Sequence, residues 1–471
     1  MTSTKTRMTA PPPARSGRQA VAFALLAGSA VATWAADAPP GGVQAGPVRL
    51  TFGGFTALET VYRDKNETAD IGSSFNSAIP FDYQTNAHLD EFRESGRQSR
   101  FSLLAQGPSD GAWSAEGYME TDFLSSGTSS NSNESNSYTL RVRHFYGVLR
   151  NSDSGWYLLG GQNWSLATLY GKGLNPRGEV TPATIDAQYA TGFNWTRNAQ
   201  LRLVKTFGNT AALGISLESP QAQWTHVPAT ALVNNSGGSL LNSTTTYTTD
   251  FAPDIIVKAA FDPGFGHYEI YGMARGFRDR FPNTTAGVNN STWGTGVGAG
   301  MVLPLGSMVT FQLSGLTGDG IGRYGTSQLP DVTVKPDGTP ATISEADVLA
   351  GLTFKPTPHQ SIYVYAGMEE ASRKAYVSGT TAFGYGNALS INSGCDSLTG
   401  TAATCAGDTK QIQQLNIGEW WKMYQGPMGN FQLGAQFSYT KRELFADTNG
   451  VAPSTNINMV FISFRYYPYQ R

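Results

Sequence analysis

The 471-residue sequence has few charged residues and only two cysteines. Charged side chains make up 14% of it, whereas soluble proteins of this size carry about 25%. Glycine, polar and aromatic residues fill the deficit, with 54 Gly, 24 Phe and 21 Tyr. This composition favours many strands joined by polar turns. The formal net charge of −2 gives no reason to expect a nucleic-acid partner.

The sequence also lacks an apolar run of transmembrane-helix length. The run at 20–34 is shorter than the ~18 residues that a spanning helix needs. It follows a basic segment and precedes small residues, so we interpret 1–35 as a signal peptide, with cleavage after residue 38 as an alternative. An uncleaved helix at the membrane surface is the competing interpretation. We expect residues 36–47 to form a flexible, Pro/Gly-rich lead-in.

Metal-binding and catalytic patterns are missing as well. The five histidines are scattered: His88, His144, His226, His267 and His359. Without ligand spacing they predict no metal and no cofactor. No strand places a nucleophile, a base and an orienting carboxylate together, so no catalytic residue is predicted. Cys395 and Cys405 lie close together in a polar loop and form a candidate disulfide, which an exported protein can hold.

What the sequence does contain is alternation with a period of two. In 112–124, Trp113 and Met119 lie on one face, and Glu116, Glu120 and Asp122 lie on the other. Such alternation is typical of half-buried strands. It occurs both in soluble sandwiches, where apolar residues point inward, and in membrane barrels, where they point outward to lipid.

The lengths of the connections favour the barrel. We predict sixteen strands, at 48–62, 98–106, 112–124, 137–150, 155–164, 194–206, 211–219, 253–262, 266–278, 291–303, 308–318, 346–355, 360–372, 410–424, 430–441 and 456–469. Short and long connections alternate between them, as in bacterial outer-membrane barrels. The predicted fold class is therefore all-β: a transmembrane 16-stranded antiparallel β-barrel spanning 48–471, with short periplasmic turns and long extracellular loops. Outer-membrane lipid and lipopolysaccharide would surround it.

The polar face of such a barrel lines its lumen. The pore-lining candidates are Arg100, Glu116, Glu120, Asp122, Arg141, Arg143 and Arg202. We expect cross-strand pairs between the arginines and the carboxylates. Two interpretations remain open: surplus arginine charge favours anionic solutes, or the charges neutralise one another and only stiffen the wall.

The connection 165–193 is rich in Gly, Pro and small residues, and its charged residues are Lys172, Arg177, Glu179 and Asp186. We predict that it folds into the barrel as a constriction loop, with an ordinary external loop as the alternative. Gly294, Gly296, Gly298 and Gly300 share lumen parity, which predicts either a bare stretch of wall or a docking face for an infolded loop. His144 has lipid-face parity, which predicts burial between protomers or a place near the periplasmic turn.

Several motifs between 97 and 220 occur in one order. They are Arg97-Gln98-Ser99-Arg100-Phe101, 116–123 (EGYMETDF), 140–147 (LRVRHFYG), 160–165 (GGQNWS), 197–202 (RNAQLR) and 218–220 (ESP). With these motifs the chain resembles the DcaP-like family of trimeric outer-membrane porins. The resemblance implies a homotrimer that passes small hydrophilic, anionic solutes passively, with dicarboxylates as candidates.

Two features depart from that family pattern. No coiled-coil segment precedes the first predicted strand, and the last aromatic residue, Tyr469, is not the final residue. Two other functions compete with the porin: a surface-exposed structural or adhesin barrel, and an outer-membrane barrel enzyme.

Overall fold

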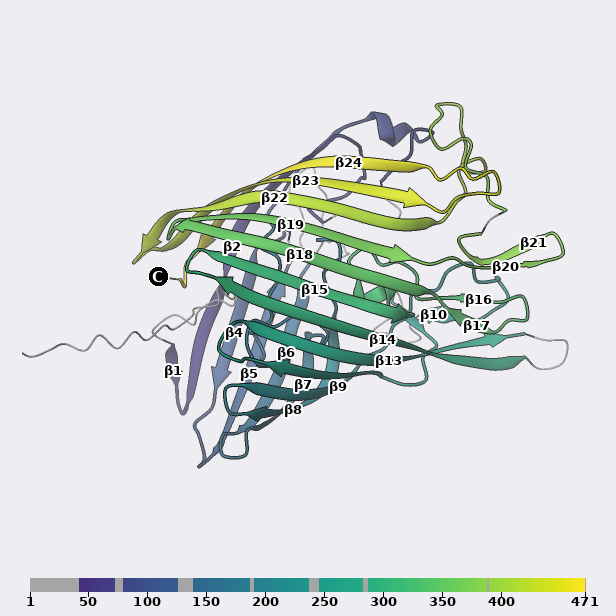
Figure 1. Cartoon of the computed structure of the whole chain (residues 1–471). Helices are drawn as coiled ribbons and strands as arrows, with labels where there is room; N and C mark the ends of the chain where they lie inside the picture. Colours follow the sequence, from purple (N-terminus) through teal and green to yellow (C-terminus); the bar gives the residue numbers. More distant parts are fainter. Residues whose placement is uncertain are drawn as a thin grey trace, which may run out of the picture. The chain divides into compact units, whose positions relative to one another are not determined.

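Sixteen strand positions pair one after another in antiparallel order, as the alternation predicts (Figure 1). The computed structural model describes residues 42–72, 79–125, 139–186, 190–236, 245–282, 287–387 and 389–470. The predicted signal peptide, with either cleavage site, lies outside the described residues. Closure comes from β2 and β24, which pair from Thr56↔Tyr466 to Arg63↔Met459.

The strands of the barrel have the following bounds. They are β2 (Val48–Arg63), β3 (Glu91–Ser95) with β4 (Arg100–Gln106), β5 (Trp113–Asp122), β6 (Arg141–Asn151), β7 (Trp156–Trp164), β8 (Arg197–Phe207), β9 (Ala211–Glu218), β12 (Asp254–Phe261), β13 (His267–Phe281), β14 (Val288–Leu305), β15 (Val309–Asp319), β18 (Ser344–Thr357), β19 (Gln360–Ala371), β22 (Thr409–Gly426), β23 (Gly429–Leu444) and β24 (Ser454–Tyr467). β3 and β4 both pair with β2 and share one strand position. The prediction placed β3 inside a loop and was wrong there.

The structure also contains shorter strands and two 3-10 helices among the described residues. They are β1 (Val43–Ala45), β10 (Asn234–Ser236), β11 (Thr246–Thr248), β16 (Val332–Val334), β17 (Pro340–Thr342), β20 (Lys374–Ser378), β21 (Thr381–Tyr385), η1 (Thr85–His88) and η3 (Gly322–Tyr324). β1 pairs with the start of β2, so the end of the lead-in 36–47 forms a short strand. Among the described residues, no helix has the length and apolar character to cross a membrane.

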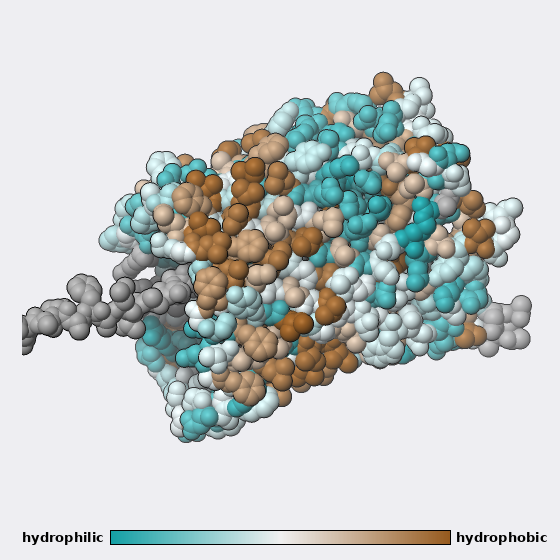
Figure 2. Space-filling model, in the orientation of Figure 1, coloured by the Kyte–Doolittle hydropathy of each residue, from teal (hydrophilic) through white to brown (hydrophobic). Residues whose placement is uncertain are grey.

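The two faces of each strand separate as a membrane barrel requires. On β23, Phe437 is 43% exposed on the outer face, whereas its neighbours Gln436 and Ser438 are buried on the inner face. Figure 2 shows hydrophobic residues gathered over the strands of the barrel side in view. A soluble sandwich would bury Phe437 and expose the glutamine, so the structure decides between the two readings of the alternation.

The interior is more apolar than the alternation predicts. Segments of 165–193 and of the connection between β15 and β18 fold inward and pack on inner-face side chains. In one cluster Leu166 and Leu174 pack with Leu159 and Ile256, and in a second Ile185 packs with residues of β19, β22 and β24. The expectation of a lumen lined only by polar groups is therefore corrected.

Candidate functional site

The connection 165–193, here called the infolded loop, enters the barrel directly after β7. Its first half is bound by charged side chains of the wall. Lys258 Nζ donates to the carbonyl oxygens of Ala167 and Thr168 at 3.3 and 2.8 Å, and the Tyr170 amide donates to Glu269 at 3.1 Å. These contacts tie the loop to β12 and β13.

The second half of the infolded loop reaches the opposite strands. Arg465 of β24 donates to the Ile185 carbonyl at 2.6 Å, and the Ile185 amide donates to Gln436 of β23 at 2.7 Å. The Gly192 amide donates to Glu369 of β19 at 2.7 Å. Gly192 has φ +83°, and a Cβ there would lie 2.0 Å from the Val348 carbonyl oxygen, so glycine is required at this contact. The loop crosses the barrel interior, and the alternative of an ordinary external loop is wrong.

Partly exposed basic side chains on the inner face gather on β4–β6. We define the basic wall as Arg100, Arg141, Arg143 and Arg150. The side chains of Arg100, Arg141 and Arg150 are 25%, 22% and 28% exposed. By contrast, inner-face side chains of β8, β12, β13 and β24 are buried. The basic wall therefore brings charged groups to water inside the barrel.

Two carboxylates of β5 bind three arginines of the basic wall. Arg141 donates to both oxygens of Asp122, at 2.8 and 2.6 Å. Arg143 lies between Glu120 at 2.5 Å and Asp122 at 3.0 Å, and Arg100 lies 3.6 Å from Glu120. The structure brings these predicted residues together as cross-strand pairs, and it leaves one more arginine than carboxylate.

A β-bulge changes the parity of β6. Glu120 pairs with His144, and Thr121 pairs with Val142, so Arg143 is the extra residue. Arg143 and His144 consequently both point inward, while Phe145 is 64% exposed outside. His144 Nδ1 lies 2.8 Å from Asn163 Oδ1. The lipid-face assignment of His144 is therefore wrong, because a regular period of two does not hold across a bulge.

Glu116 joins the basic wall to the infolded loop. It accepts from Arg150 at 3.2 Å and from Arg177 of the loop at 3.3 Å. Arg177 also lies over the ring of Tyr118, 5.3 Å from its centre, and is 30% exposed. Sequence reasoning did not select Arg150, because an uninterrupted period of two from Arg141 places it on the lipid face and only the bulge turns it inward.

Other predicted site residues serve the packing of the loop. Arg202 is fully buried, donating to the Tyr170 hydroxyl and, at 2.6 Å, to the Trp164 carbonyl; its prediction as a water-facing residue is wrong. Glu179 is buried and accepts from Asn163 at 3.2 Å and from Tyr170 at 3.1 Å. Asp186 is also buried, whereas Lys172 is exposed.

The glycine row of β14 is a docking face and not a bare wall. A Cβ on Gly298 would lie 2.1 Å from the Tyr271 ring, and one on Gly300 would lie 2.5 Å from Leu169 of the infolded loop. Elsewhere, Cys395 and Cys405 form a disulfide in the loop before β22. The residues that the structure describes contain no group of three or more His, Cys, Asp or Glu suited to a metal ion.

Comparisons with known proteins agree on the architecture. No family model matches the chain, and no curated protein matches it. The crystal structure of the outer membrane channel DcaP of Acinetobacter baumannii matches with a TM-score of 0.64 and 16% identity, covering 90% of this chain and 99% of that one. The chain has the fold of the DcaP channel. An anion-selective porin from Comamonas acidovorans also matches, with 10% identity and a TM-score of 0.48, covering 89% of this chain and 99% of that one.

Proposed function

We propose that this protein is an outer-membrane porin that lets small hydrophilic anions diffuse passively through the barrel. The observation that carries the proposal is the basic wall, which faces the infolded loop and keeps three of its four side chains, those of Arg100, Arg141 and Arg150, partly exposed. An arginine-lined constriction attracts anions and repels cations. The infolded loop, with Arg177 at its surface, acts as the constriction.

The charges near this constriction favour the first of the two interpretations left open by the sequence. The wall and loop bring five arginines to three carboxylates: Arg100, Arg141, Arg143, Arg150 and Arg177 with Glu116, Glu120 and Asp122. The surplus is two positive charges. Solutes with two carboxylates can bind two guanidinium groups at once, so dicarboxylates are the candidate solutes.

The proposed protein has no catalytic cycle and no cofactor, is exported by the signal peptide 1–35, and resides in the outer membrane among lipid and lipopolysaccharide. A liposome-swelling assay with small sugars and dicarboxylates tests the pore. Swelling separates a porin from a structural barrel, an adhesin or an enzyme, none of which has to conduct. Reversal potentials across a planar bilayer then test anion preference; a cation-selective or non-conducting protein would contradict the proposal.

The outer face supports a homotrimer. A row of small residues crosses four strand positions at one level, with Ala105 paired to Gly117, Gly117 to Gly147 and Gly147 to Gly160. Phe145 beside this row is 64% exposed. A row of small residues beside large apolar side chains lets a second barrel approach closely, so we place the subunit contact on β4–β7.

Gly160→Leu tests this contact. A Cβ at Gly160 would meet no atom within 4 Å, so the barrel itself accommodates the side chain. Conductance steps should change from threes to ones, and the trimer band on a native gel should disappear. Gly272→Leu on β13 is the matched control, because its Cβ is similarly unobstructed. Equal assembly of both variants would move the contact elsewhere.

A further inference from the structure

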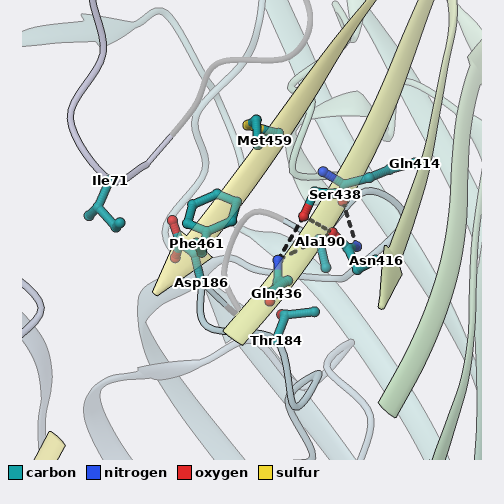
Figure 3. Close-up of a pocket in the computed structure, with 10 residues that line it drawn as sticks. All are labelled: Ile71, Thr184, Asp186, Ala190, Gln414, Asn416, Gln436, Ser438, Met459 and Phe461. Carbon is teal, nitrogen blue, oxygen red and sulfur yellow. Dashed lines mark hydrogen bonds between the residues drawn. The ribbon is translucent and has the colours of Figure 1, made fainter. Parts of the chain in front are cut away.

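A small cavity lies where the infolded loop meets the wall of β22–β24 (Figure 3). Its volume is about 10 Å³, room for about one water molecule. Asp186 of the loop points into it with a side chain only 7% exposed. Among the described residues, neither carboxylate oxygen of Asp186 has a hydrogen-bond partner. Burying an ionised carboxylate without partners costs several kcal/mol or more.

The polar groups of the wall around the cavity are engaged with one another, whereas Thr184 Oγ1 of the loop has no hydrogen-bond partner among the described residues. Gln436 donates to Ser438 at 2.8 Å, Ser438 donates to Asn416 at 2.6 Å, and Asn416 donates to Gln414 at 3.0 Å, as the dashed lines in Figure 3 show. The other side of the cavity is apolar, formed by Ile71, Ala190, Met459 and Phe461. The lining thus stabilises a neutral group better than an anion.

The charged groups that act on Asp186 already have partners. They are Glu59 and Arg63 of β2, Arg141 of β6 and Arg465 of β24. Arg465 pairs with Glu59 at 2.8 Å, Arg63 with Glu91 at 2.9 Å, and Arg141 with Asp122 at 2.6 Å. Glu59 repels a negative charge on Asp186. Burial, with Glu59 as the next cause, raises the pKa of Asp186 to about 8.

We propose that Asp186 is a proton-linked latch: its carboxyl group holds a proton while the 183–186 segment lies on the wall, and loss of that proton favours release of the segment into the lumen. Three hydrogen bonds flank it. Trp420 donates to the Ala183 carbonyl at 2.7 Å, and Ile185 bonds Gln436 and Arg465 at 2.7 and 2.6 Å. A negative charge on Asp186, which lies between these contacts, opposes the docking of the segment that they hold on the wall.

The direction of the pH effect follows from linkage. A released aspartate titrates near pH 3.9, so the docked segment binds the proton more tightly. Docking is therefore strongest at acidic pH, weakens by up to about tenfold per pH unit as pH rises from about 4, and changes no further above about pH 8. Release should widen the lumen, since the segment lies across it.

The test uses a single thiol on the segment. The described residues hold no free cysteine, so Thr184→Cys introduces a reporter at a buried position. We would compare its labelling by a charged thiol reagent, from about pH 5 to about pH 9, with labelling of T184C/D186N. The ratio of the two rates should rise up to about tenfold per pH unit and level off near pH 8, because Asp186→Asn stays neutral and cancels the titration of the thiol itself.

A second readout needs no introduced cysteine. Wild-type single-channel conductance should rise over the same pH range, and D186N should keep the low value throughout; Asp153→Asn, in the turn before β7, is the control that should follow the wild type. Conductance depends on the proposed pore, whereas labelling reports the segment alone, so failure of one proposal is distinguishable from failure of the other. A constant labelling ratio, or dependence on a metal ion or chelator in place of pH, would overturn the latch.

Discussion

Arg177 of the infolded loop lies 3.3 Å from Glu116 of β5, an ion pair between this loop and the barrel wall. The same carboxylate accepts from Arg150 at 3.2 Å. One negative charge thus offsets two partly exposed arginines, and in the proposed porin the charge balance of this group sets the field beside the lumen.

Glu116→Gln should increase anion preference. The change removes the carboxylate charge and keeps the shape of the side chain, so Arg150 and Arg177 present more positive charge to the lumen. We expect the anion-to-cation permeability ratio from reversal potentials to rise by about twofold or more, falling with added salt because screening weakens the field. Asp153→Asn removes a negative charge at a turn and should leave the ratio unchanged. An unchanged ratio in E116Q would remove this group from the selectivity site.

Substitutions of Arg143 and Arg141 should separate effects on stability from effects on ion selectivity. Arg143 is 3% exposed between two carboxylates, so Arg143→Ala takes from Glu120 its closest counter-charge and should cost about 3–5 kcal/mol of unfolding free energy. Arg141 is 22% exposed, and Arg141→Ala should cost less but lower anion preference. Denaturant unfolding in detergent and reversal potentials measure the two effects. Anion preference that survives both substitutions would show that neither residue sets it.

Gly298→Ala should disturb the docking of the infolded loop. The new Cβ would lie 2.1 Å from the Tyr271 ring, and the Tyr271 hydroxyl accepts from Asn194, next to the loop, at 2.7 Å. Displacing the ring should cost about 1–3 kcal/mol of unfolding free energy. Adding Tyr271→Ala should restore room for the Cβ. The double variant should therefore lose less unfolding free energy than the two single variants lose together. Purely additive costs would show that the predicted clash is relieved elsewhere.

His226 and Asp408 should link two outer loops in a pH-dependent way. Their side chains lie 2.7 Å apart, and the hydrogen bond to Asp408 raises the pKa of His226. A raised histidine pKa means that the stabilisation is fully present below about pH 6.5 and is lost as pH rises through the higher value in the folded protein. Limited proteolysis of the loops should therefore accelerate with rising pH in the wild type. H226Q should be cut at a rate that does not vary with pH over this range, after correction for the protease's own profile.

The sequence predicted the architecture because its evidence is local and repeated. Alternation marks each strand, and the alternating short and long connections predict the even number of strand positions. It also placed Glu120, Asp122 and Arg141 on one face and indicated that 165–193 folds inward. The strand faces depend on neighbours along the chain or on the adjacent strand, which a period of two encodes directly.

The tertiary structure alone decided what surrounds those side chains. The bulge at Arg143 turns His144 inward, and no residue type in β6 announces it. Arg202 has the parity of a pore residue, yet the infolded loop covers it completely. In the sequence Asp186 does not differ from other loop carboxylates, and its burial follows only from the packing of the loop on β22–β24. Burial and charge balance depend on segments hundreds of residues apart, so only the closed barrel and its docked loop determine which polar groups meet water.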